Sequence, residues 1–260
     1  MQDQDTAIAT GLTDLGFEGE VRSDLSSRLM YATDASIYRE EPMAVVYPRH
    51  AEDIKRLLAF AVKQRIGIIP RAAGTSLAGQ VVGSGIVADL SRHFSKILEI
   101  NTEERWVRME PGVVPDELNA LLRSHGLLFG PETSTSNRCN IGGMIGNNAC
   151  GLHSLVYGSV RDHIIEADAI LHDGSEVTFG ELTEEQYRQK CTLQNAEGEI
   201  YREIDRIMSD PENQDAIRSD YPDFTIPRRN TGYALDDLLY SEPFTPGTGR
   251  GLNLARLITG

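Results

Sequence analysis

The clearest hydrophobic pattern lies between residues 42 and 71. An apolar run, Ala44 to Tyr47, stands between two prolines, which is typical of a short strand. A second apolar run, Ile66 to Pro70, predicts another buried strand. Between the runs, apolar residues recur three and four positions apart, which predicts one face of an amphipathic helix: Ile54, Leu57, Leu58, Ala61 and Val62. The pattern therefore predicts a β-α-β unit whose second strand leads into a glycine-rich loop.

Weaker patterns predict the remaining elements. Strands are expected at 86–90, 96–100 and 106–110. A helix is expected at 115–125, with Leu118, Leu121 and Leu122 inward and Gly126 as a left-handed cap. A hairpin is expected from strands 164–171 and 176–179, joined by the two-residue turn signal Asp173-Gly174. The polar stretch 129–158, rich in small residues, predicts a long loop.

The C-terminal third differs in character. Residues 181–225 predict two charged helices, of which the clearer has Ile200, Ile204, Ile207 and Met208 on one side. We interpret this segment as an insertion on the surface. A short helix is expected at 234–240, followed by a loop rich in glycine and proline and a further helix close to residue 260.

Charge and composition narrow the function classes. Lys and Arg number 25 against 39 Asp and Glu, a net charge of −14 that disfavours binding to nucleic acid or an anionic membrane surface. No apolar run approaches the ~20 residues that span a bilayer, and the N-terminus shows no export signal, so a cytoplasmic protein is predicted. The three cysteines and six histidines show no metal-ligand spacing, which predicts no metal site.

Two polar loops carry the candidate chemistry. In the first, residues 74–79 have the G-x4-G spacing of a phosphate loop, but Gln80-Val81 replace the Lys-Ser/Thr that nucleotide hydrolysis needs. The second, residues 131–151, consists largely of Gly, Ser, Thr and Asn, which supply hydrogen-bond donors and little apolar area. No G-x-G-x-x-G lies between a strand and a helix, which disfavours a nicotinamide site. The pair of loops suits a large phosphate-bearing cofactor.

These segments resemble one known family. Pro70-Arg71-x-x-Gly74-Thr75-Ser76-Leu77-x-Gly79 is followed by Pro111-Gly112-Val113, Ile141-Gly142-Gly143-Met144, Asn148-Ala149-x-Gly151, Tyr157-Gly158-x-x-Arg161-Asp162 and Leu171-x-Asp173-Gly174. The order is similar to that of the FAD-linked oxidases and dehydrogenases of the vanillyl-alcohol-oxidase or PCMH type. Within this family the chain most resembles the D-lactate and D-2-hydroxyglutarate dehydrogenase branch. The resemblance runs from about residue 42 to 179 and again over 226–260.

The resemblance implies an α+β fold of two subdomains with FAD between them. Residues 1–41 would form an N-terminal helical extension, 42–112 a small FAD-binding subdomain, and 113–260 a larger one. The implied FAD contacts are Arg71, Ala73, Gly74, Thr75, Ser76, Leu77, Gly79, Gln80, Pro131, Thr133, Ser134, Asn140, Gly142, Gly143, Asn147, Asn148, Gly151, Tyr157, Gly158, Ile164 and Ile165. No histidine occurs from 71 to 80, which implies noncovalent flavin.

The substrate implied by the resemblance is a D-2-hydroxy acid that passes a hydride to FAD. Arg228, Arg229 and Tyr233 are the implied substrate residues, although a solvated loop remains an alternative for this segment. Two roles remain possible for Arg71, Arg138 and Arg161, namely a contact with a cofactor phosphate or a salt bridge. Two roles also remain possible for His153 and His163, namely acid-base catalysis or a structural role. No residue is identified as the catalytic base.

Relatives of this family continue into a cap domain that carries substrate ligands, and the long ones add an iron–sulfur region. We therefore expect this chain to be an N-terminal fragment or a split subunit. One alternative function is a non-catalytic module that holds FAD or a nucleotide for a partner chain. A second is a sugar-nucleotide site without redox chemistry.

Overall fold

The computed structural model describes residues 2–223, 225–226, 228–229 and 232–260. The chain divides into two compact units. Unit 1 comprises Met1–Phe129 and Ser134–Met144, and unit 2 comprises Gly130–Thr133 and Ile145–Gly260. The boundary proposed after residue 112 therefore falls inside unit 1. The second polar loop contributes chain to both units.

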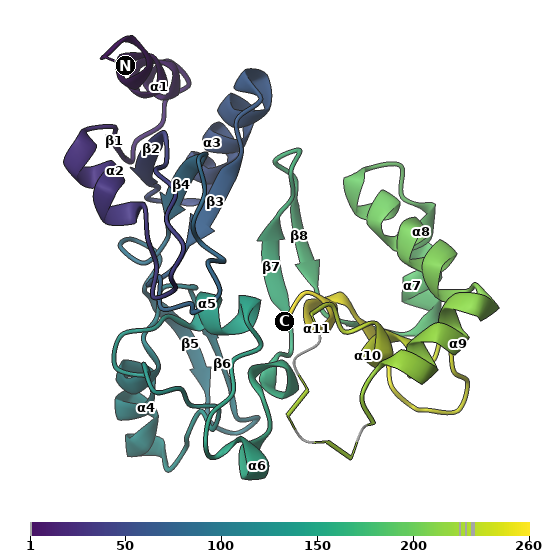
Figure 1. The fold of residues 1–260 in the computed structure, drawn as a ribbon. Helices are drawn as coiled ribbons and strands as arrows, with labels where there is room; N and C mark the ends of the chain where they lie inside the picture. Colours follow the sequence, from purple (N-terminus) through teal and green to yellow (C-terminus); the bar gives the residue numbers. More distant parts are fainter. Residues whose placement is uncertain (1, 224, 227, 230–231) are drawn as a thin grey trace. The chain divides into compact units, whose positions relative to one another are not determined.

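Unit 1 is built on a four-stranded sheet with the order β1-β2-β4-β3 (Figure 1). The strands β2 (Ala44–Tyr47), β3 (Ile68–Arg71) and β4 (Ile86–Asp89) run parallel, which confirms the predicted β-α-β unit. Every residue of β2 and β4 is buried, as expected for the centre of a parallel sheet. The sequence pattern did not reveal β1 (Glu20–Arg22), which pairs antiparallel with β2 at the edge.

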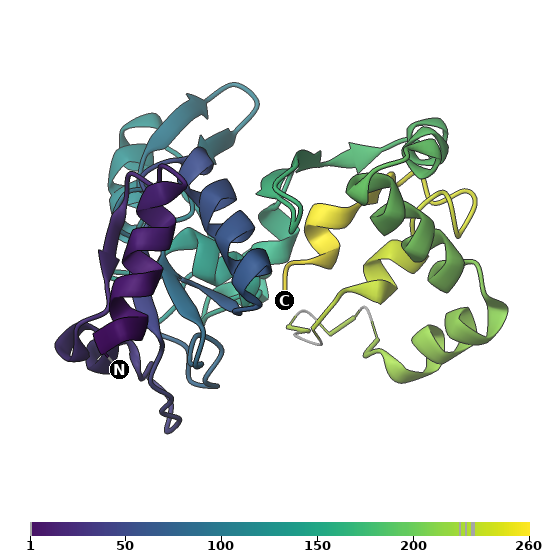
Figure 2. The same cartoon turned by 90° about the horizontal axis from the view of Figure 1, so that it is seen from above.

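The helix α3 (Ala51–Gln64) packs on this sheet. Its buried apolar positions are Leu57, Phe60 and Ala61. The predicted face was wrong in one detail, because Val62 is 65% exposed and Phe60 takes its place toward the core. The helix α1 (Gln2–Asp14) adds Ile8 and Leu12 to the same core and lies beside α3 (Figure 2).

The rest of unit 1 consists of a hairpin and short helices. The predicted strands β5 (Ile97–Asn101) and β6 (Trp106–Met109) pair antiparallel. The helix α4 (Pro115–Leu122) buries Leu118 and Leu122, but Leu121 is 44% exposed, so its predicted inward position was wrong. A 3-10 turn, η1 (Arg123–His125), completes the predicted span and ends at the left-handed Gly126, as predicted.

Residues 1–41 include more than helices. Besides α1 and β1 they form α2 (Leu25–Tyr31), which Asp24 caps by accepting a hydrogen bond from the Ser27 N–H. The stretch 129–158 is also more ordered than the predicted loop, since it contains α5 (Ile141–Gly146) and α6 (Ser154–Tyr157). Helices of six and four residues are too short for a hydrophobic period to appear in the sequence.

Unit 2 contains α6, the 3-10 turn η2 (Val160–His163) and the hairpin of β7 (Ala167–Ile170) and β8 (Glu176–Phe179). The predicted strand start at Ile164 was wrong, because this residue ends η2. The hairpin loop has three residues rather than two. Leu171 and Ser175 close it, and Gly174 takes the left-handed conformation (φ +83°) of a bulged turn.

In the described part of unit 2, the remaining helices are α7 (Glu184–Thr192), α8 (Ala196–Met208), α9 (Pro211–Asp220), α10 (Leu235–Leu239) and α11 (Leu254–Leu257). A short pair, β9 (Glu181–Leu182) and β10 (Leu252–Asn253), joins α7 to the C-terminal segment. The helices of 181–225 are not a surface appendage, because Tyr201 and Met208 share one core with Phe179 of the hairpin and Leu238 of α10.

An ion-pair cluster fixes α10 to α11. Asp237 accepts hydrogen bonds from Arg256 Nε at 2.9 Å and from Arg250 Nη2 at 2.7 Å. Burial alone would raise the pKa of Asp237, but the hydrogen bonds and charges of the two arginines together lower it. A carboxyl whose pKa is lowered by folding stabilises the fold above its unfolded pKa, and this contribution is lost as the pH falls through the folded value.

Asp237→Asn is therefore expected to lower the free energy of unfolding by about 2 kcal/mol at pH 7. The difference from wild type should stay constant above about pH 5 and shrink below about pH 4, where the wild-type carboxyl also becomes neutral. Urea unfolding across this pH range measures it. The exposed variant Asp215→Asn is the control and should show no measurable change. A loss for Asp237→Asn that is the same at pH 3 and pH 7 would contradict the assignment.

Candidate functional site

The first polar loop, residues 72–80, connects β3 to a bend before β4. Gly74 (φ +67°) and Gly79 (φ +73°) take left-handed conformations that glycine adopts without strain. The backbone N–H groups of Gly74, Thr75, Ser76 and Leu77 donate no hydrogen bond to any other residue that the structure describes. Such a run of uncommitted donors can bind the oxygens of a phosphate. We call residues 72–80 the phosphate loop.

Arg71 lies at the base of the phosphate loop and is buried. Its Nη1 and Nη2 donate to the carbonyl oxygens of Tyr31 and Thr33, at 3.3 and 2.9 Å. The guanidinium also packs against Gly74, where a side-chain Cβ would clash with it. The structure thus gives Arg71 backbone partners from the N-terminal segment, and the salt bridge considered from the sequence is not among its recorded contacts.

The helix α5 lies beside the phosphate loop. A Cβ on Gly143 would stand 3.2 Å from the Ala72 Cβ, and one on Gly142 would stand 2.5 Å from the Pro111 Cβ. Asn140, which precedes α5, is buried and donates from Nδ2 to the Gly112 carbonyl at 2.8 Å. Its Oδ1 is also buried and has no hydrogen-bond partner among the described residues. An amide oxygen without a partner is an acceptor that a ligand hydroxyl or N–H can satisfy.

The predicted cofactor residues therefore fall into two groups. Unit 1 brings together Arg71 and Ala73, Gly74, Thr75, Ser76, Leu77, Gly79 and Gln80 of the phosphate loop with Gly142 and Gly143 of α5, and Ser134 and Asn140 belong to the same unit. Unit 2 contains Pro131, Thr133, Asn147, Asn148, Gly151, Tyr157, Gly158, Ile164 and Ile165. The cofactor role of both groups stays a prediction.

In unit 2, the segment around Asn148 is held by internal contacts. Asn148 is buried with φ +39°, and its Oδ1 accepts from the Arg161 N–H at 2.9 Å. Gly158 (φ +77°) has no room for a side chain beside Asp162. His153 pairs with Glu132 at 2.9 Å, and His163 Nε2 contacts the Tyr157 carbonyl oxygen at 2.7 Å. Both histidines thus have structural partners.

Arg161 is buried and stabilises unit 2 through hydrogen bonds to carbonyl oxygens of the same unit. Its Nε donates to the Thr259 carbonyl at 2.9 Å, and its Nη2 donates to the Gly232 carbonyl at 3.0 Å. Burial, only partly offset by Asp236 and other nearby carboxylates, lowers the pKa of Arg161. The guanidinium therefore joins three separate parts of the chain.

The predicted substrate residues differ in how exposed their side chains are and in whether a carboxylate of the same unit already binds them. Arg229 donates to the buried Asp236 at 2.5 Å, so its charge is matched inside the unit. Arg228 is exposed, with Nη2 at 3.4 Å from the Cys150 Sγ, and Tyr233 is 67% exposed. Asn230 and Thr231, which complete this motif, lie outside the described residues.

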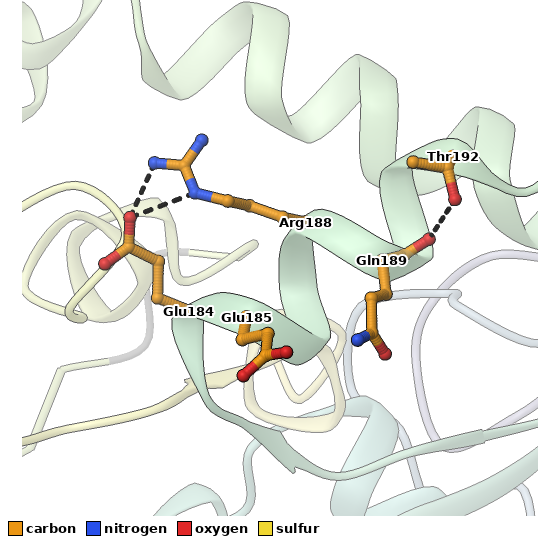
Figure 3. A pocket seen from close by; sticks show the side chains of 5 residues that line it. All are labelled: Glu184, Glu185, Arg188, Gln189 and Thr192. Carbon is orange, nitrogen blue, oxygen red and sulfur yellow. Dashed lines mark hydrogen bonds and ion pairs between the residues drawn. The ribbon is translucent and has the colours of Figure 1, made fainter.

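Among the residues with described positions, no group of three or more His, Cys, Asp or Glu side chains could hold a metal ion. Within the same part of the chain, no helix is both long and apolar enough to cross a membrane. A surface hollow of about 480 Å³ lies along α7 and includes none of the predicted site residues. Figure 3 shows there Arg188 turned toward Glu184, a surface ion pair within one helix.

The residues that support the phosphate loop from the N-terminal side left no signal in the sequence pattern. Tyr31 and Thr33 meet Arg71 through their carbonyl oxygens, and the Tyr38 ring packs against Gly79. Contacts through carbonyl oxygens leave no side-chain signal, because any residue type offers the same acceptor.

Comparison with protein families identifies the class. The model of a family described as an FAD binding domain matches residues 42–180, which contain the phosphate loop, α5 and the hairpin of unit 2. The chain belongs to this family. Residues 42–180 therefore form an FAD-binding domain of PCMH type, and the predicted α+β class is confirmed.

The related proteins include dehydrogenases of 2-hydroxy acids. D-2-hydroxyglutarate dehydrogenase of Pseudomonas putida is 40% identical over 233 residues, which are 87% of this chain and 22% of that protein. Mitochondrial D-lactate dehydrogenase (cytochrome) of Kluyveromyces lactis is 35% identical over 142 residues, 53% of this chain and 24% of that protein. The chain thus spans about a fifth to a quarter of the length of these relatives.

A solved structure supports the fold. 6-Hydroxy-D-nicotine oxidase of Arthrobacter nicotinovorans matches 64% of this chain and 36% of its own, with a TM-score of 0.57 and 23% sequence identity. This similarity concerns the fold alone.

Proposed function

We propose that the chain binds FAD noncovalently through the phosphate loop and serves a dehydrogenase that oxidises a D-2-hydroxy acid. The observation that carries the proposal is the run of four backbone N–H groups, Gly74 to Leu77. They have no hydrogen-bond partner among the described residues and lie inside a matched FAD-binding domain. A pyrophosphate is the part of FAD that such a run of donors recognises.

The residues present suit the cofactor. The phosphate loop offers donors for the phosphate oxygens, and the Asn140 Oδ1 offers a buried acceptor for a hydroxyl or N–H of the cofactor. Gly143 leaves the surface of α5 beside Ala72 free of a side chain, which allows close approach of a ligand to the backbone. No histidine stands in the phosphate loop, which supports a noncovalent complex. Bound flavin would supply the hydride acceptor.

The substrate class rests on the relatives. The first four curated relatives are all named D-2-hydroxyglutarate dehydrogenase and share 36–44% of aligned residues with this chain. We propose that Arg228 attracts the substrate carboxylate, since it is the exposed arginine of its motif, whereas Arg229 is engaged by Asp236. Tyr233 is the second candidate for substrate contact. No described residue is assigned as the base, and a cytoplasmic location stays a prediction.

An anaerobic half-reaction tests the proposal. The flavin-loaded protein is mixed with D-2-hydroxyglutarate or D-lactate, and the absorbance of the oxidised flavin near 450 nm is expected to fall. The L-enantiomers serve as matched controls and should leave the spectrum unchanged. Reduction by neither D-acid, with dithionite still able to reduce the flavin, would favour the alternative of an FAD-holding module that needs a partner chain with the substrate domain.

A further inference from the structure

The N-terminal segment just before the matched family domain forms a compact turn, which we call the N-terminal turn (residues 32–40). Thr33 and Arg39 pair through a β-bridge, and the Glu40 N–H donates to the Ala32 carbonyl at 2.9 Å. Inside the turn, Asp34 Oδ1 accepts from the Ser36 N–H and Ser36 Oγ accepts from the Tyr38 N–H. These bonds give the turn a defined shape although most of its side chains are exposed.

One end of the phosphate loop is joined to this segment through Arg71. The Arg71 guanidinium donates to the carbonyl oxygens of Tyr31 and Thr33 and lies 4.9 Å from the centre of the Tyr31 ring. The Tyr31 hydroxyl donates to the buried Asp89, and Asp89 is the register partner of Arg71 in the sheet. The start of the loop is therefore tied both to β4 and to the residues that open the N-terminal turn.

The other end of the loop is covered by Tyr38. Gly79 is left-handed, and a Cβ at this position would stand only 2.6 Å from the Tyr38 Cδ2. The tyrosine ring is thus packed directly on the glycine backbone, while 56% of the residue stays exposed. Between the two contacts lie the four N–H groups that find no hydrogen-bond partner in the part of the chain that the structure describes.

We infer that the N-terminal turn is a positioning element of the FAD site, because it holds the phosphate loop at Arg71 and at Gly79 in the conformation that binds the pyrophosphate. This inference rests on the proposed FAD function and places Arg71 and Tyr38 outside direct contact with the phosphates. A loop fixed before binding loses less conformational entropy when the ligand arrives, so its affinity is higher. The turn lies outside the region 42–180 that defines the family.

The first test removes the contact at Gly79. Tyr38→Ala is expected to weaken FAD binding about tenfold, because the end of the loop becomes free to move. Tyr38→Phe keeps the ring and should bind as wild type does. Ile37→Ala changes a neighbouring side chain that is 94% exposed and is the matched control. The dissociation constant is measured from the quenching of flavin fluorescence on titration of apoprotein. The melting temperature of the Tyr38→Ala apoprotein should stay within about 2 °C of wild type, since this side chain is half exposed.

The second test separates a positioning role of Arg71 from a phosphate contact. Arg71→Gln should raise the dissociation constant for FAD and leave its dependence on salt concentration as in wild type. Direct contact with a phosphate would instead make binding by the variant less dependent on salt, because one ionic contact is lost. The Tyr38 series stands on its own if Arg71→Gln does not fold.

The outcomes distinguish a failure of the proposed FAD function from a failure of the inference about the N-terminal turn. Wild-type protein that takes up no FAD would overturn the proposed function and this inference with it. FAD uptake by wild type, with Tyr38→Ala binding equally well, overturns the inference alone. A flattened salt dependence for Arg71→Gln would also overturn it, since Arg71 would then contact the phosphates.

Discussion

Gly143→Val is expected to abolish FAD binding, with a dissociation constant raised at least about 100-fold. Gly143 lies in the first turn of α5, where a Cβ would already stand 3.2 Å from the Ala72 Cβ. Valine adds a branched side chain with little rotational freedom in a helix, so it cannot turn away from the phosphate loop. The added methyl groups push α5 from the loop and cover the backbone that the cofactor approaches.

A graded series makes the Gly143 prediction sharp. Gly143→Ala requires a shift of only a few tenths of an ångström and is expected to weaken binding by less than about tenfold. Gly146→Val is the matched control on the same helix, because no heavy atom lies within 4 Å of a Cβ built there. The measurement is the number of FAD molecules retained per chain after gel filtration, with circular dichroism as a check of folding. Full FAD content in folded Gly143→Val protein would refute the site.

Arg161→Met is expected to lower the free energy of unfolding by about 3 kcal/mol. The substitution removes the hydrogen bonds to the carbonyl oxygens of Thr259 and Gly232 and leaves the buried Thr259 carbonyl without these donors. It also removes one of the positive charges near Asp236 and Asp237, which keep Arg229, Arg250 and Arg256 as partners. Arg161→Lys should not restore stability, because a single ammonium cannot reproduce the guanidinium geometry toward two separate carbonyl groups.

Urea unfolding followed by two probes shows which unit Arg161→Met destabilises. Far-ultraviolet circular dichroism reports both units, whereas Trp106, the single tryptophan, reports unit 1. The dichroism transition is expected to move to lower urea in Arg161→Met and to shift more than the Trp106 fluorescence transition. Arg188→Met, which removes an exposed surface ion pair on α7, should change neither transition. A wild-type urea midpoint for Arg161→Met would contradict the structural role.

Much of the sheet of unit 1 was predictable because its signals are local. The run Ala44 to Tyr47, the period of α3 and the run before Arg71 each lie in a few consecutive residues. The edge strand β1 has three residues and no buried face, so no pattern marked it. In unit 2, the period of α8 predicted the helix, but only the fold shows that its Tyr201 is buried against Phe179.

The sequence predicted the glycines of the candidate site but not the residues that hold the phosphate loop in place. A glycine-rich sequence marks where the backbone must be free, and the left-handed Gly74 and Gly79 confirm the loop. The residues that contact Arg71 and Gly79 are Tyr31, Thr33 and Tyr38, which precede them in the chain by 38 to 41 positions. They make contact through two carbonyl oxygens and one aromatic ring. No spacing rule connects such positions, since their proximity depends on how β1 and α2 bring the N-terminal segment onto the sheet.

The central claim is that this chain binds FAD without a covalent bond, and one measurement tests it most directly. The visible absorption spectrum is recorded for the purified protein after incubation with FAD and gel filtration, and again after denaturation and filtration. The account predicts a two-banded flavin spectrum at close to one FAD per chain that leaves with the filtrate on denaturation. A folded protein that remains colourless after incubation with FAD would contradict the account, and flavin that stays with the denatured chain would contradict its noncovalent form.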